Sequence, residues 1–71
     1  MKRPFSQFLR TDILRTAQGA ISTFGIVNIP LLAEQVRKRN EAENVAVEDI
    51  EHELLQQAQF LNAAIEFDAS R

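Results

Sequence analysis

The 71-residue chain contains no cysteine, so it can form neither a disulfide nor a thiolate metal site. Chains this short bury only about 60% of the surface that they expose when unfolded, and their cores are marginal without a staple or a partner. Stability must therefore come from helix packing or from self-association. The absence of cysteine also fits a protein of the cytosol, and we expect a cytoplasmic location.

No segment reaches the roughly 18 consecutive apolar residues that a transmembrane helix requires. The first five residues carry two cations, but no continuous apolar stretch follows them, so they do not read as a secretory signal. A helix lying on a membrane surface would use apolar side chains near the N-terminus that so small a domain needs for its core. We therefore expect no membrane partner.

Residue types that carry chemistry are equally scarce. The single histidine, His52, follows Glu48 and Asp49 at helical spacings, as in carboxylate-bridged metal sites. Such sites need further carboxylates from other helices, and Asp12 and Glu34 are the only acids before residue 40. No serine lies at a suggestive spacing from a base, and no glycine-rich phosphate loop is present. We expect no enzyme activity, no metal, no cofactor and no small-molecule substrate.

Basic residues are missing from most of the C-terminal half. No lysine or arginine lies between Asn40 and Ser70. The formal net charge is −7 for residues 40–71 and +5 for residues 1–39. This asymmetry indicates a surface partner or complementary pairing of two protomers.

Apolar residues recur every three or four positions in three segments and predict helices over residues 4–23, 30–39 and 47–62. A β-branched run at 26–29 and an alternating run at 64–67 predict two strands that pair with each other. The expected core stripes are Phe5, Leu9, Ile13, Ala17, Ala20, Ile21 and Phe24; Ile29, Leu32, Ala33 and Val36; and Val47, Ile50, Leu54, Ala58 and Leu61.

Turn and cap residues are expected at the ends of these helices. Pro4 suits the first turn of the first helix, and Asn28 or Ile29 suits the cap of the second. Gly25 and Asn40 suit left-handed conformations that end the first and second helices.

The segments after the first helix form an ordered series. They are Ile26-Val27-Asn28-Ile29-Pro30 leading into Leu32-Ala33-Glu34-Gln35-Val36, then Val45-Ala46-Val47-Glu48-Asp49-Ile50, Leu54, Leu55 and Ala64-Ile65-Glu66-Phe67. This series resembles the first strand, scaffold helix, recognition helix and wing strand of a winged helix-turn-helix domain. The resemblance implies a mainly α fold class, in which residues 1–71 form one three-helix winged-helix-like domain with a small two-stranded β element. Two departures are a missing second wing strand and a turn, 40–46, longer than the about 3–4 residues of a simple helix-turn-helix.

The same resemblance implies DNA binding by helix 47–62, but the charges on that helix oppose it. The helix carries Glu48, Asp49, Glu51 and Glu53, which repel a polyanion. Candidate nucleic-acid contacts therefore lie elsewhere, at Arg37, Lys38, Arg39, Lys2 and Arg3, with Arg10 and Arg15 as further cations. The simpler interpretation of these cations is a solvated helix end and a basic terminus.

Five large apolar side chains lie off the main stripes or at their ends, and are candidates for an interface: Phe5, Phe8, Leu31, Leu55 and Phe60. Burying each would contribute about 1.5–3 kcal/mol, although scattered apolar residues are normal on any surface. Our hypothesis is a small interaction domain that associates first with a second copy of itself, as a homodimer. It is either a DNA-binding regulator or a protein-interaction module that uses the winged-helix shape without DNA.

Overall fold

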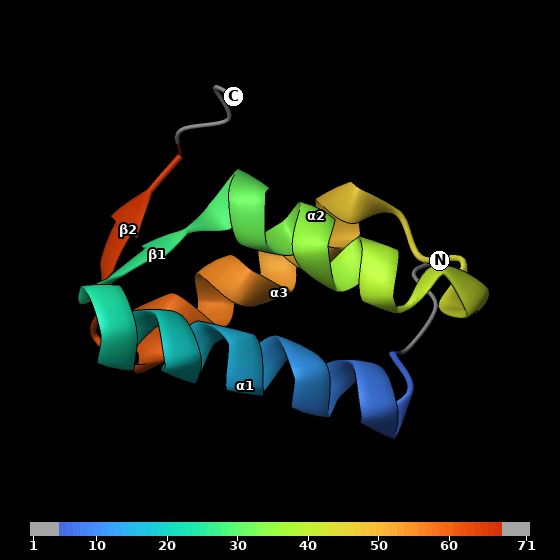
Figure 1. Ribbon diagram of the computed structural model, residues 1–71, viewed down its shortest axis with the longest axis horizontal. Coiled ribbons are helices and arrows are strands. Elements are labelled where there is room, and N and C mark those ends of the chain that lie inside the picture. The colour runs from blue at the N-terminus through green and yellow to red at the C-terminus, as the bar shows by residue number, and fades with distance from the viewer. Residues whose placement is uncertain (1–4, 68–71) are drawn as a thin grey trace.

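The computed structural model describes residues 5–67 and has the predicted order of elements (Figure 1). Its elements are α1 (Gln7–Phe24), β1 (Ile26–Asn28), α2 (Ile29–Arg39), a short 3₁₀ turn η1 (Glu41–Glu43), α3 (Val47–Phe60) and β2 (Ala64–Glu66). The mainly helical fold class is confirmed, and the arrangement is compatible with a winged-helix-like shape. No helix among residues 5–67 is long and apolar enough to cross a membrane.

α1 begins later than predicted because Ser6 caps it. The Ser6 hydroxyl accepts a hydrogen bond from the Leu9 backbone N–H at 3.0 Å, which satisfies one of the free donors of the first turn. The same hydroxyl donates to Glu43 at 2.8 Å and so ties the start of α1 to η1. The expected role of Pro4 lies outside the described residues.

α2 begins one residue earlier than predicted, at Ile29, with Asn28 as its cap. The Asn28 side chain accepts from the Leu31 N–H at 3.4 Å. The predicted left-handed conformation of Asn40 is wrong, since its φ is −124°. Asn40 instead ends the helix through its side-chain amide, which donates to the Val36 carbonyl at 2.8 Å.

α3 ends at Phe60, two residues earlier than predicted, because Asn62 adopts a left-handed conformation with φ 59°. The Ala63 N–H then reaches back to the Ala58 carbonyl at 2.9 Å, and the Asn62 N–H reaches Gln59 at 3.0 Å. These two bonds form a Schellman motif, in which asparagine takes the position that glycine usually holds.

The two strands pair in parallel, with Ile26 opposite Ala64, Val27 opposite Ile65 and Asn28 opposite Glu66. Side chains alternate between the faces of a strand, so Val27, which is fully buried, and Ile65 share the inner face. Ile26 and Asn28 lie on the outer face. In Figure 1, β2 forms the outer edge of the sheet, and β1 lies between β2 and the helices.

The buried core of the described residues is entirely aliphatic and follows the predicted stripes closely. Its members are Leu9, Ile13, Ala17, Ala20, Val27, Ile29, Ala33, Val36, Ile50, Leu54 and Ala58. None of the five phenylalanines belongs to it. The prediction that Phe24 lies in the core is wrong, because Phe24 is the last residue of α1 and extends beyond the packed part of the helix. Leu61 is only half-buried for a similar reason, since α3 has already ended.

Gly25 ends α1 in the predicted left-handed conformation, with φ 74°. We expect Gly25→Ala to destabilise the domain by about 1 kcal/mol, because an L-residue is strained at this φ even where space is free. Gly19→Ala is the matched control. Gly19 lies on the exposed side of α1 with open space around it, so alanine should stabilise the helix by about 0.5–1 kcal/mol. Urea unfolding measures the change in the free energy of unfolding for each variant. Changes of the same sign in both variants would contradict this account.

Candidate interaction surfaces

Two of the three cations at the end of α2, Arg37 and Arg39, form ion pairs in different directions. The Arg37 guanidinium pairs with Glu34 one turn earlier on the same helix, with its Nε donating to Oε1 at 3.2 Å. This hydrogen bond raises the pKa of Arg37 further above its already high value. Arg37 therefore points back along α2.

The Arg39 side chain contacts residues of α1. Its guanidinium donates to both carboxylate oxygens of Asp12, at 3.1 and 2.9 Å, and to the Thr16 hydroxyl at 2.7 Å. The Asn40 side-chain amide also donates to Asp12, at 2.7 Å. Partial burial would raise the pKa of the Asp12 carboxyl. The hydrogen bonds from Arg39 and Asn40, with the charge of Arg39, outweigh burial and hold that pKa below its ordinary value.

These ion pairs reduce the ability of Arg37, Lys38 and Arg39 to contact a phosphate backbone. Arg37 and Arg39 each have a carboxylate partner within the domain, and a phosphate would have to compete with it. Lys38 is exposed. The candidate contacts Lys2 and Arg3 lie outside the described residues, so their role stays a prediction.

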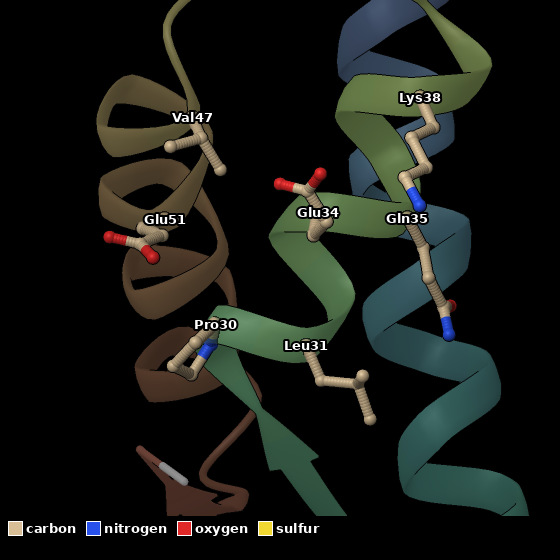
Figure 2. A pocket seen from close by; sticks show the side chains of 7 residues that line it. All are labelled: Pro30, Leu31, Glu34, Gln35, Lys38, Val47 and Glu51. Carbon is tan, nitrogen blue, oxygen red and sulfur yellow. The ribbon is translucent and has the colours of Figure 1, made fainter. Parts of the chain in front are cut away.

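A groove of about 580 Å³ is lined by residues of α2 and α3 (Figure 2). Its lining residues are Pro30, Leu31, Glu34, Gln35 and Lys38 of α2, with Val47 and Glu51 of α3. In Figure 2 the Glu34 carboxylate points toward α3, from which Glu51 projects, while Lys38 lies on the far side of α2. The groove thus mixes charges of both signs, with its carboxylates on the side that faces α3.

The acids of α3 lie where the sequence places them. Glu48 is exposed, and Asp49, Glu51 and Glu53 are half-buried in the first half of the helix. His52 is exposed among them. Within residues 5–67, no group of three or more potential metal ligands comes together. This helix presents an acidic surface.

The predicted interface residues fall into two groups. Phe8, Leu31 and Phe60 are exposed, whereas Phe5 and Leu55 are partly buried against the core. Phe5 and Leu55 therefore contribute to the fold of the protomer as well. Whether any of the five lies in an interface stays a prediction.

Sequence reasoning missed two exposed phenylalanines, Phe24 and Phe67. Phe24 continues the spacing of the α1 stripe, so helical periodicity alone assigns it to the core. Gly25 was the available signal, since a left-handed end at this position leaves the residue before it at the tip of the helix. Phe67 follows the last residue of β2 and projects past the end of the sheet pairing.

A second, smaller hollow of about 250 Å³ lies over the outer face of β1. It is lined by Ala20, Phe24, Ile26, Asn28, Leu31, Leu32 and Glu66. Glu66 is the single charged residue of this lining, and its carboxylate accepts a hydrogen bond from the Asn28 side chain at 3.2 Å. The rest of the hollow is mostly apolar.

Comparisons of the chain with protein-family models, with curated proteins and with solved structures give no match. The functional argument therefore depends on the surfaces of this chain alone.

Proposed function

We propose that this protein is a non-enzymatic interaction domain that acts first by associating with itself. The observation that carries the proposal is the position of its phenylalanines. Four of the five are largely exposed, namely Phe8 at 82%, Phe24 at 75%, Phe60 at 85% and Phe67 at 63%, and Leu31 is exposed at 52%. The largest apolar side chains of the chain lie on its surface, while small and aliphatic ones fill its core.

Such a distribution has an energetic cost for an isolated protomer and a benefit for an associated one. Covering a large apolar side chain contributes about 1.5–3 kcal/mol, and phenylalanine is a residue type enriched at protein interfaces. A domain of this size has a marginal core and no disulfide, so association with a second copy would add to the stability that its own packing provides.

DNA binding is supported less well, for electrostatic reasons. α3, which would read bases in a winged-helix domain, presents acids in its first half. Arg37 and Arg39 are paired with Glu34 and Asp12. A DNA complex would have to break or share these pairs and bring α3 toward a polyanion, which favours the alternative without DNA.

Sedimentation equilibrium of the full chain over a wide range of concentrations tests the proposal. We expect the average mass to rise from that of the monomer toward that of a dimer. Adding a generic DNA duplex at low salt should leave the sedimentation of the protein unchanged. A chain that stays monomeric at the highest concentration, and that binds the duplex with an affinity falling steeply with salt, would replace our proposal by the DNA-binding function.

A further inference from the structure

The hollow over β1 has few charged residues around it. Residues 16–33 carry no acidic or basic side chain, although 25% of the chain is charged. This uncharged segment forms the end of α1, all of β1 and the start of α2. Every residue that lines the hollow belongs to it except Glu66, which is bonded to Asn28.

The hollow also combines a cavity with projecting apolar side chains. Phe24 and Leu31 line it from the end of α1 and the start of α2, and each has more than half of its surface exposed. The same patch therefore contains the hollow and, in Phe24 and Leu31, exposed apolar side chains that could enter such a hollow on another molecule. An interface about a two-fold axis requires this kind of self-complementary patch, because the same surface meets itself.

We propose that the hollow is the docking site for a second copy of this chain, with Phe24 of each copy inserted against the hollow of the other. The proposal rests on the self-association proposed above and assigns it to one surface. The charge pattern favours a second copy as occupant. A strongly charged patch would face like charge across a two-fold axis, whereas the lining of this hollow carries one charged residue, Glu66, whose carboxylate accepts a hydrogen bond from Asn28.

The area of the patch indicates a modest affinity. Covering Phe24 and Leu31 on both copies would remove roughly 500 Å² from water, taking about 150–250 Å² for a phenylalanine. Specific interfaces bury a total of about 1,200 Å² or more, so the rim of the hollow must supply the remainder. Charge-depleted apolar centres with a polar rim are the usual composition of such contacts.

Two α1 variants test the assignment, Phe24→Gln and Phe8→Gln. Both replace an exposed phenylalanine of the same helix by an uncharged helix-forming residue, but only Phe24 lines the hollow. We expect Phe24→Gln to raise the dimer dissociation constant by about tenfold or more, as removal of a central anchor does, and Phe8→Gln to raise it less. A larger effect of Phe8→Gln would overturn the assignment and move the interface to the start of α1. Sedimentation equilibrium measures the constant, and far-ultraviolet circular dichroism shows that each variant is folded.

Leu31→Gln is the third variant, since it alters the lining of the hollow from a different helix. It should weaken the dimer in the same direction as Phe24→Gln. If neither Phe24→Gln nor Leu31→Gln changes the association, the assignment to this surface is wrong and the proposed function still stands. A wild-type chain that never associates overturns the proposed function itself. That outcome would leave the exposed apolar patch to a different protein.

Discussion

Replacing Leu54 by alanine is expected to destabilise the domain by about 2–5 kcal/mol, the largest single effect that we predict. Leu54 lies in the middle of α3 and is completely buried. α3 packs against both α1 and α2, so a cavity on its buried face weakens the packing of this central helix. Stabilities of about 0.05–0.15 kcal/mol per residue are usual, so this loss is a large part of the total and could unfold the chain. Urea unfolding followed by circular dichroism at 25 °C measures it.

The matched control for this cavity is Leu31→Ala, which removes the same atoms from an exposed position on α2. Its effect on the unfolding of the monomer should be within about 0.5 kcal/mol, as for most surface substitutions. The comparison should be made at a protein concentration low enough to keep the chain monomeric. Equal losses in the two variants would show that Leu54 is not the centre of the core.

Replacing Asp12 by alanine is expected to destabilise the domain by about 1–2 kcal/mol at neutral pH. Asp12 is the acceptor for Arg39, Asn40 and Thr16, and it joins the first half of α1 to the end of α2. The Asp12 side chain is 25% exposed and that of Arg39 is 49% exposed, so solvent screens part of the ion pair. The control is Arg37→Ala, which breaks an exposed pair within a single helix and should destabilise the domain less than Asp12→Ala does.

The contribution of Asp12 should also depend on pH. Its folded pKa lies below the ordinary value of 3.8, so its charged form is favoured in the folded state. The stabilisation is therefore fully present above pH 3.8 and is lost as the pH falls through the lower, folded pKa. The difference in unfolding free energy between wild type and Asp12→Ala should be constant near neutrality and shrink only under acid conditions. A difference that grows on acidification would show that Asp12 is not stabilised as a carboxylate.

Helical periodicity was sufficient to predict the three helices and nearly all of their buried positions, because one apolar face of each helix packs inward. Ala33 and Val36 on α2, and Ile50 and Leu54 on α3, are buried as their spacing predicts. Local cap chemistry was equally informative at Gly25 and Asn28, where one residue determines how a helix ends or begins.

Features that depend on contacts between distant residues could not be predicted in this way. The pairing of Asp12 with Arg39 joins residues that are 27 positions apart and requires the packing of α1 against α2 to be known. This pairing is what removes Arg39 from a basic patch that seemed continuous in the sequence. The hollow over β1 is similar, since nothing local brings Glu66 next to Asn28.

The parallel pairing of β1 with β2 makes the hollow a late product of folding. The strands are separated by 38 positions, and α2 and α3 lie between them in the chain. Pairing over such a separation has a loop-closure cost that local helix formation does not have, so the helices are expected to form before the sheet closes. Because Glu66 lines the hollow from β2 and the other lining residues come from α1, β1 and α2, a chain with an open sheet presents the hollow without the part that β2 supplies. Dimerisation through the hollow would then select completely folded protomers and hold their sheets closed.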